Sequence, residues 1–257
     1  MRNCKRFLAA LLASMMMFSL AACEGSGSEE KEPAAETAGS AESEDAGNEK
    51  AEVKSMDAAE LQKIEDDKDK KEECLVIDVR SEEEYKEGHV KFAINMPIDT
   101  FADNLASIEE WKDKAVITVC NSGKKSGEAA DILVENGFSD VTNAEGVADG
   151  GYNLVTWGNI RADELQEAGD AGDIAIVDLR DAADYEAGHF KNAINADPEK
   201  MEDAQGELPS DKGAKIITHC YSGNKSAVAA QALVDMGYTN VYNCLDGAKE
   251  VEYNFAE

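Results

Sequence analysis

The sequence contains an internal repeat that covers most of its length. Residues recur at a constant offset of 100, without a gap, from Asp78 and Asp178 to Asn143 and Asn243. A period of this length exceeds the repeats of solenoid proteins and approaches the size of a small domain, so each copy can bury a core of its own. The repeat predicts two globular domains in tandem, at 55–158 and 159–257, and duplication is its simplest explanation.

Each copy alternates strand-like and helix-like patterns. Apolar, β-rich runs at 75–79 and 115–119 are typical of strands buried on both faces, and the second copy repeats them at 174–177 and 215–218. A helical pattern follows the second run of each copy, and a further strand is expected after it. This order predicts an α/β fold in which each domain is a mainly parallel sheet flanked by helices.

The helix that follows the second run has start and stop signals in both copies. Ser126 and Ser226 are the predicted N-caps, because a serine hydroxyl can accept from the first free backbone N–H groups. Gly137 and Gly237 are the predicted C-terminal stops, since glycine adopts the left-handed conformation that ends many helices.

A cysteine lies between strand and helix in each copy. Cys120 and Cys220 come directly after the second apolar run, at the predicted carboxyl end of a strand, where open α/β sheets place their sites. The thiolate is the reactive form of cysteine, and loop amides together with a helix N-terminus stabilise its negative charge. The pattern therefore predicts two reactive-thiol sites.

The residues after each cysteine are the predicted substrate-binding loops. Their amides and lysine ammonium groups would surround and attract an anion, which the acidic remainder of the chain would repel. The first loop comprises Asn121, Ser122, Gly123, Lys124, Lys125 and Ser126, and the second comprises Tyr221, Ser222, Gly223, Asn224, Lys225 and Ser226.

Several short motifs, each present twice in the same order, resemble the rhodanese family. In the first copy they are Asp78-Val79-Arg80, Glu84-Tyr85, Gly88-His89-Val90, Ala93-Ile94-Asn95 and the loop from Cys120 to Lys125-Ser126. The resemblance implies tandem rhodanese-like domains with sulfurtransferase activity. Cys120 and Cys220 would then carry sulfane sulfur as persulfides, from thiosulfate or a persulfide donor to cyanide or another thiol-like acceptor.

Other polar residues of these motifs are interpreted as structural. Asp78 with Arg80, and the matching pair in the second copy, Asp178 with Arg180, are expected to form buried ion pairs. Packing and hydrogen bonding suffice to explain His89 and its counterpart His189. His219 precedes Cys220, but Val119 occupies its place in the first copy, so His219 is at most a modulator.

Charge and motif content argue against several classes of partner. The formal net charge of −29 disfavours electrostatic binding to nucleic acid or to anionic lipid headgroups. Neither metal-ligand spacing nor a phosphate-binding glycine fingerprint occurs, so we expect no metal and no other cofactor.

The start of the chain predicts export and membrane anchoring. A basic beginning and an apolar run over 7–22 are typical of a signal peptide, and Leu20-Ala21-Ala22-Cys23 resembles a bacterial lipobox. That resemblance implies a signal peptide at 1–22, lipidation of Cys23 and an extracytoplasmic protein anchored to the cell membrane. A plain signal peptide or an uncleaved anchor is the alternative. Residues 23–54 are rich in Glu, Ala, Gly, Ser and Lys and predict a disordered acidic tether.

Two further cysteines have no role in the predicted sites. Cys74 and Cys244 are interpreted as small buried hydrophobic residues in preference to a disulfide. The second copy also lacks a match to Gly150-Gly151 and Trp157, so its last packing element is expected to be reduced.

Two other functions fit parts of the pattern. Phosphatases and arsenate reductases wrap an oxyanion in a cysteine loop, but their loops are one residue longer and usually end in arginine, whereas Ser126 and Ser226 stand here. A tethered module that binds sulfane sulfur or acts as a scaffold without turnover is the other alternative. Thiols and lysines in both loops weigh against it.

Overall fold

The computed structural model describes residues 51–255. The predicted signal peptide, Cys23 and most of the tether lie outside these residues. Residues 51–54 belong to the folded part, contrary to the predicted end of the tether at 54. The apolar side chains of Ala51 and Val53 pack against the core of the first domain, and the strand that follows begins at Lys54. Among the described residues, no helix is long and apolar enough to cross a bilayer.

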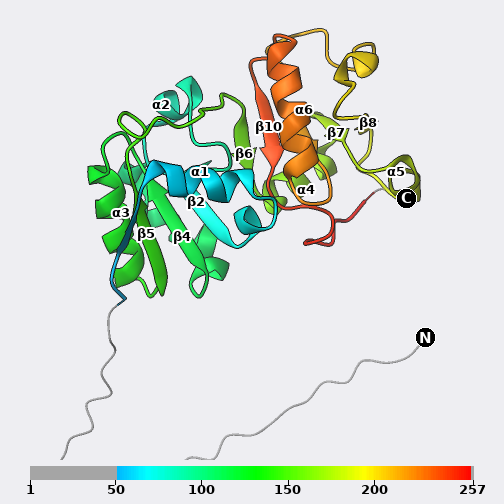
Figure 1. Cartoon of the computed structure of the whole chain (residues 1–257). Coiled ribbons are helices and arrows are strands. Elements are labelled where there is room, and N and C mark those ends of the chain that lie inside the picture. Colours follow the sequence, from blue (N-terminus) through cyan, green and yellow to red (C-terminus); the bar gives the residue numbers. More distant parts are fainter. Residues whose placement is uncertain (1–50, 256–257) are drawn as a thin grey trace, which may run out of the picture. The chain divides into compact units, whose positions relative to one another are not determined.

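Both halves of the described chain are α/β units, as predicted. The first unit is a five-stranded sheet in the order β1-β5-β4-β2-β3, with every pair parallel. Figure 1 shows β5, β4 and β2 of this sheet side by side. Its strands are β1 (Lys54–Met56), β2 (Cys74–Asp78), β3 (Ile94–Asn95), β4 (Ala115–Val119) and β5 (Asp140–Ala144).

The second unit repeats this topology. Its sheet has the order β6-β10-β9-β7-β8, again with all pairs parallel. Its strands are β6 (Gly158–Ile160), β7 (Ala175–Asp178), β8 (Ile194–Asn195), β9 (Ile216–His219) and β10 (Val241–Cys244). The predicted boundary between residues 158 and 159 falls inside β6, an edge strand too short to leave a sequence pattern.

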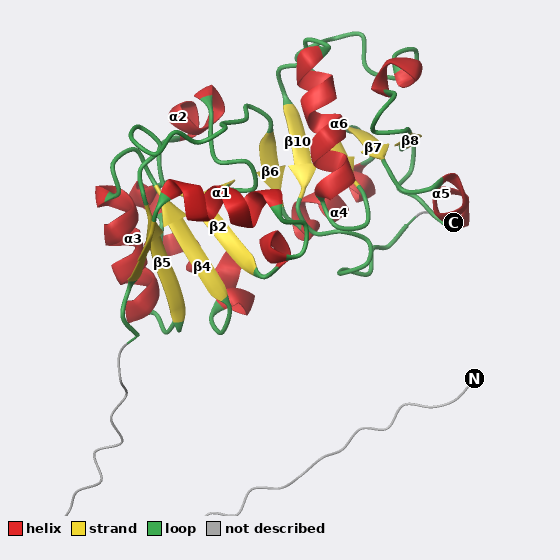
Figure 2. Cartoon of the chain, in the orientation of Figure 1, coloured by secondary structure: helices red, strands yellow, loops and turns green. Residues whose placement is uncertain are grey.

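Helices flank the two sheets (Figure 2). The α-helices are α1 (Ala58–Asp66), α2 (Glu82–Glu87), α3 (Lys124–Glu135), α4 (Ala162–Ala171), α5 (Ala182–Ala187) and α6 (Asn224–Asp235). The 3₁₀ segments are η1 (Lys70–Glu72), η2 (Ile98–Thr100), η3 (Ala102–Trp111) and η4 (Met201–Ala204). Helix α3 packs on β4 and β5, and helix α6 packs on the matching strands β9 and β10.

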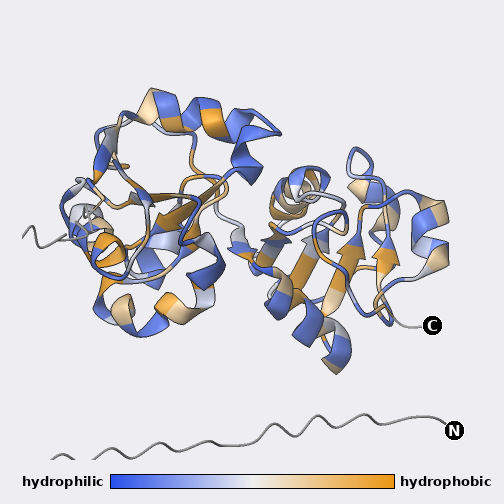
Figure 3. Cartoon of the chain, turned by 90° about the horizontal axis from the view of Figure 1, so that it is seen from below, coloured by the Kyte–Doolittle hydropathy of each residue, from blue (hydrophilic) through white to orange (hydrophobic). Residues whose placement is uncertain are grey.

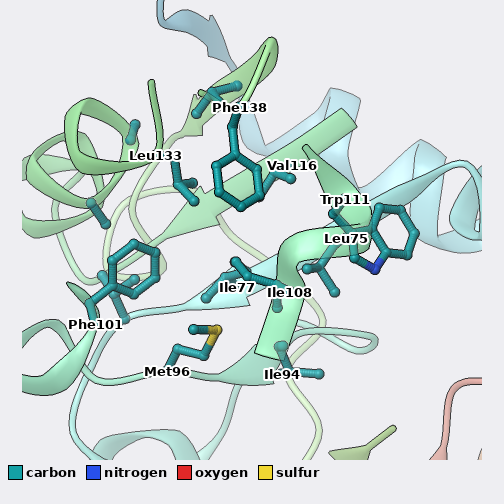
Figure 4. Close-up of a cluster of buried hydrophobic side chains, with 14 of the residues drawn as sticks. Leu75, Ile77, Ile94, Met96, Phe101, Ile108, Trp111, Val116, Leu133 and Phe138 are labelled. Carbon is teal, nitrogen blue, oxygen red and sulfur yellow. The ribbon is translucent and has the colours of Figure 1, made fainter. Parts of the chain in front are cut away.

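Each sheet has apolar side chains on both faces, as the continuous apolar runs predicted. In the first unit, residues from η3 and α3 converge with strand residues on one face of the sheet, and Figure 4 shows Phe101, Ile108 and Leu133 around Ile77. The opposite face packs against Leu61 of α1. In Figure 3 the strands of the second unit are mostly apolar, whereas the helices carry polar residues.

The two units contact each other through polar and apolar groups. The Asn159 side chain donates to the Ala93 carbonyl at 2.9 Å, and its backbone N–H donates to the Tyr85 hydroxyl at 3.2 Å. Phe92 belongs by sequence to the first unit but packs in a core cluster of the second, together with Trp157.

The predicted helix stops are confirmed, but the predicted caps are wrong. Gly137 and Gly237 have φ of +88° and +91°, directly after the C-cap residues of α3 and α6. Helix α3 begins at Lys124 with Gly123 as its N-cap, so Ser126 lies inside the first turn. The serine is buried there because its side chain has a different partner, described below.

Candidate active site

The two cysteines lie directly after β4 and β9, at the carboxyl ends of these strands. The loop that follows each cysteine turns back into a helix within a few residues. This turn requires a left-handed residue, and Gly123 and Gly223 supply it with φ of +79° and +72°. The cysteine side chain is thereby held over the N-terminus of α3 or α6.

Hydrogen-bond donors surround the sulfur of Cys120. The Ser126 backbone N–H lies 3.3 Å from Sγ and the Ser126 hydroxyl lies 3.2 Å from it. Burial raises the pKa of the Cys120 thiol, but the Ser126 hydroxyl and the backbone N–H groups of Ser126, Ser122 and Gly123 together bring that pKa below its usual value. Because these donors favour the thiolate, Cys120 is set up as a nucleophile.

Cys220 has the same nearest partners. The backbone N–H and the hydroxyl of Ser226 each lie 3.4 Å from its Sγ. Both sulfurs belong to buried residues, and Ser126 and Ser226 are fully buried. The two serines therefore serve the cysteines rather than the helix ends.

The lysines of the loops are exposed to solvent. Lys124 and Lys125 form no ion pair with any described residue. Lys225 lies 3.3 Å from Asp181. The first loop therefore has two lysines outside any ion pair at its mouth, whereas Lys225 of the second loop is paired with a carboxylate.

The remaining loop residues are also placed near the cysteines. Asn121 donates to Glu84 and accepts from Arg80 at 3.4 Å. The Tyr221 hydroxyl donates to Asp184. The Asn224 side chain donates to the Ser222 hydroxyl at 3.0 Å. Ser122 is exposed and Ser222 is half-buried.

The predicted buried ion pairs are confirmed. Arg80 contacts Asp78 at 2.6 Å, and its guanidinium also donates to the Gly88 carbonyl at 2.7 Å. The pair of Asp178 and Arg180 has the same distance. Each pair ties the end of β2 or β7 to the turn after α2 or α5, which supports the edge of the sheet that carries the cysteine.

The three histidines have structural contacts. His89 and His189 each place Nδ1 2.9 Å from the carbonyl oxygen four residues earlier and stack on a tyrosine ring. Burial lowers the pKa of His89 to about 4. His219 is fully buried, with Nε2 3.4 Å from Asp178 Oδ2 and its ring against Phe190.

A family profile decides the classification of this fold. The profile of the rhodanese-like domain matches residues 57–154 and again residues 161–253. The chain belongs to the rhodanese-like family.

Known proteins resemble parts of these rhodanese-like domains. The thiosulfate sulfurtransferase PspE of Escherichia coli is 41% identical over 73 residues, which are 28% of this chain and 70% of that protein. The tRNA uridine(34) hydroxylase of Hamiltonella defensa is 28% identical over 170 residues, which are 64% of this chain and 48% of that protein. The chain thus spans about half the length of that relative.

A solved structure, a rhodanese with anions from Escherichia coli, is 38% identical. It covers 32% of this chain and 96% of its own, with a TM-score of 0.30.

Two glycines that the sequence analysis did not single out pack directly against the backbone of the cysteine loops. A Cβ added to Gly146 would lie 2.1 Å from the Asn121 carbonyl oxygen, and one added to Gly247 would lie 1.8 Å from the Tyr221 carbonyl oxygen. Only glycine allows the two backbones to approach this closely. An available signal was the acid-glycine pair after the last strand of each copy, Glu145-Gly146 and Asp246-Gly247.

These acid-glycine pairs show that the repeat continues beyond Asn143 and Asn243 with an offset of 101. Tyr152 donates to the Glu145 carbonyl at 2.8 Å, and Tyr253 donates to the Asp246 carbonyl at 2.7 Å. The second domain thus keeps the tyrosine contact of the first, whereas Gly150-Gly151 and Trp157 have no match in it. Tyr253 is buried against Phe190, and one inserted residue hides the match in the sequence.

The support of the two loops differs at one asparagine. In the first domain the Asn143 side chain donates to the Gly123 carbonyl at 2.9 Å, and its Oδ1 lies 2.7 Å from the Ser126 hydroxyl. In the second domain Asn243 donates to Asn159 at 3.3 Å. A Cβ at Gly127 would lie 3.2 Å from the Asn143 amide, and the second domain has alanine at the matching position 227.

Cys74 and Cys244, the other two cysteines within residues 51–255, are free thiols, so no disulfide joins them. Cys244 is buried and Cys74 is half-buried, and burial raises the pKa of each thiol to about 12. Both are therefore poor nucleophiles at neutral pH, in contrast to Cys120. Within residues 51–255, no three His, Cys, Asp or Glu side chains are grouped as metal ligands would be.

Proposed function

We propose that the protein is an extracytoplasmic sulfurtransferase that carries sulfane sulfur on Cys120 and Cys220. The observation that carries this proposal is the set of donors around Cys120. They favour a thiolate, and the same N–H groups would stabilise the charge of a persulfide in its place. The similarity of one domain to PspE of Escherichia coli supports thiosulfate as a donor.

The proposed reaction has two steps. The Cys120 thiolate attacks the outer sulfur of thiosulfate, so that a sulfur–sulfur bond to the cysteine forms, the bond within thiosulfate breaks, and sulfite leaves with the electron pair. Cyanide or an acceptor thiolate then attacks the outer sulfur of the persulfide and regenerates the cysteine thiolate. Cys220 follows the same course. Charge balances in both steps, because each exchanges one anionic nucleophile for one anionic leaving group.

The positive groups at the loop mouths fit an anionic donor. The exposed lysines Lys124 and Lys125 would attract thiosulfate and stabilise the departing sulfite. An ammonium is a point charge and does not select a planar anion by two parallel hydrogen bonds, as a guanidinium does. The lysines are therefore compatible with either thiosulfate or a small persulfide as the donor.

The sharpest test is thiocyanate formation from thiosulfate and cyanide by the full chain. Cys120→Ser, Cys220→Ser and the double variant are compared with the parent, and Cys74→Ser is the matched control. We expect each single variant to retain part of the activity, the double variant to lose it, and the control to be unaffected. If the parent forms a persulfide but passes its sulfur neither to cyanide nor to a thiol acceptor, the protein is instead a sulfane-sulfur-binding module without turnover.

We further propose that Cys23 is lipidated and anchors the protein outside the cytoplasm. The support is the lipobox-like sequence Leu20-Ala21-Ala22-Cys23 after an apolar run. In the cells that produce the protein, labelled palmitate should be incorporated into the parent chain and not into Cys23→Ser. Labelling of both chains, or of neither, would contradict the anchor.

A further inference from the structure

A lysine of the first domain reaches the cysteine loop of the second domain. Lys71 lies in η1 and is 8% exposed, which is unusual for a lysine, and its ammonium donates to the carbonyl oxygen of Ser222. The ammonium also lies 5.2 Å from the ring centre of Phe92. Burying a lysine ammonium costs free energy unless the charge is paired and hydrogen-bonded. The groups around Lys71 therefore show what its charge interacts with.

The charges around Lys71 include the sulfur of the second site. Burial lowers the pKa of the Lys71 ammonium, and the negative charges of Glu250, Glu72, Cys220 and Asp246 act in the opposite sense. Lys71 and Cys220 therefore interact electrostatically across the contact between the domains.

The contact with Ser222 also acts through the peptide bond. In a trans peptide the carbonyl oxygen and the next N–H point in opposite directions, so a donor held on the Ser222 carbonyl orients the Gly223 N–H. In the first domain the matching N–H, that of Gly123, is one of the groups that stabilise the Cys120 thiolate. Lys71 is thus placed to aim and polarise the equivalent donor at Cys220.

The first loop has no such partner and has more charge of its own. Among the described residues, none donates a hydrogen bond to the Ser122 carbonyl. The first loop carries Lys124 where the second carries Asn224. Lys225, the lysine that the second loop retains, is paired with Asp181. Lys71 supplies from the neighbouring domain the charge that the second loop lacks.

We propose that Lys71 is a positioning residue of the second cysteine site, which orients the Ser222–Gly223 peptide and stabilises negative charge on Cys220. Its role in sulfur transfer rests on the proposed function, whereas its effect on the reactivity of the Cys220 thiol does not.

The test compares Lys71→Met with Lys71→Arg in the full chain. Alkylation by iodoacetamide is followed from pH 5 to pH 10 on the separate peptides that carry Cys220 and Cys120. Lys114→Met is the matched control, because Lys114 lines the same cavity of about 750 Å³ and lies over the Trp111 ring without touching the loop. Thiocyanate formation is measured in parallel in the Cys120→Ser background.

We expect Lys71→Met to slow alkylation of Cys220 at pH 7 about tenfold and to move the midpoint of its pH profile upward. Cys120 in the same molecules should keep its profile, which also shows that the variant is folded. Lys71→Arg should restore most of the rate. If Lys71→Met does not fold, Lys71→Gln, which also removes the charge, is judged by the same criteria.

An unchanged Cys220 profile, an equal shift at Cys120, or the same shift from Lys114→Met overturns the proposal. A Cys220 shift in a chain that forms no thiocyanate supports the role of Lys71 and contradicts only the proposed sulfur transfer.

Discussion

The loops 120–126 and 220–226 place a cysteine, a left-handed glycine and a buried serine at the same positions, yet their surroundings differ. Most of the first loop is exposed, and its two lysines face solvent. In the second loop Gly223 is buried, Tyr221 and Ser222 are half-buried, and residues of the first domain reach it. The two copies share the hydrogen-bond donors at the sulfur, but they differ in the residues that hold the loop in place.

The difference in support begins with small changes in side-chain volume. Gly127 leaves room for Asn143 to hold the first loop, whereas Ala227 stands at the matching position and Asn243 binds Asn159 instead. The second loop compensates with contacts from outside its own domain. We therefore expect the first site to depend on its own domain and the second site to depend on the contact between domains.

The largest expected effect comes from the glycines behind the loops. Gly146→Ala should slow alkylation of Cys120 about a hundredfold and destabilise the first domain by about 3 kcal/mol, because the new Cβ would overlap backbone atoms that cannot move aside. Gly247→Ala should do the same to Cys220. Thermal unfolding and site-specific alkylation measure both effects. Gly206→Ala, with open space around its Cβ, is the control, and equal effects from all three variants would contradict this explanation.

A smaller effect is expected from the serine beside each sulfur. Ser126→Ala removes a hydroxyl that lowers the pKa of the Cys120 thiol, so the thiolate fraction at pH 7 and the alkylation rate should fall about tenfold. The pH profile of Cys120 should move upward, since the pKa rises. Ser226→Ala is the matched control and should leave the Cys120 profile where it was. A Ser126→Ala profile identical to that of the parent would show that the backbone N–H groups act alone.

The stability of the first domain should depend on pH through one buried glutamate that the second domain lacks. Burial raises the pKa of Glu65 in α1 to about 7, and one of its carboxylate oxygens has no partner among the described residues. The folded state holds this proton to a higher pH than the unfolded state does. Stability is therefore lost as the pH rises from the usual glutamate range to above 7. In α4 the matching residue is Gly169, which carries no such charge.

Glu65→Gln should remove this loss and raise the free energy of unfolding at pH 8 by about 1 kcal/mol, since part of the gain is offset by an unpaired amide. Urea unfolding at pH 5 and pH 8 measures it. The exposed Glu60→Gln is the control on the same helix. Equal destabilisation by Glu65→Gln at both pH values would count against a charged Glu65 as the cause.

The smallest expected effect tests whether the asparagine near the end of the last strand supports the cysteine loop in the first domain and not in the second. Asn143→Ala removes the side chain that holds the Gly123 carbonyl and should slow alkylation of Cys120 about threefold, the loss of a modest hydrogen bond. Asn243→Ala should leave the rate at Cys220 unchanged, because the Asn243 side chain donates to Asn159 and not to a carbonyl of its loop. Comparable losses at both sites would mean that the two loops have the same support after all.

The sequence by itself determined the tandem α/β fold and the position of the two cysteines. A repeat at constant offset and continuous apolar runs suffice for this, because burial on both faces of a parallel sheet leaves a pattern that local sequence records. The same holds for Gly137 and Gly237, whose place after a helix predicts the left-handed conformation that they adopt. The buried pair of Asp78 and Arg80 was likewise predictable, since its members are two residues apart.

Only the tertiary structure decided what surrounds each sulfur. Ser126 looked like a helix cap, but it is a partner of Cys120, because Gly123 is the N-cap and the helix begins three residues earlier than its pattern suggests. Gly146 and Tyr253 depend on backbone approaches and an inserted residue that spacing cannot reveal. Lys71 meets Ser222 across 151 positions of sequence. Such contacts are set by how separate elements pack in space, and that information lies in no local pattern.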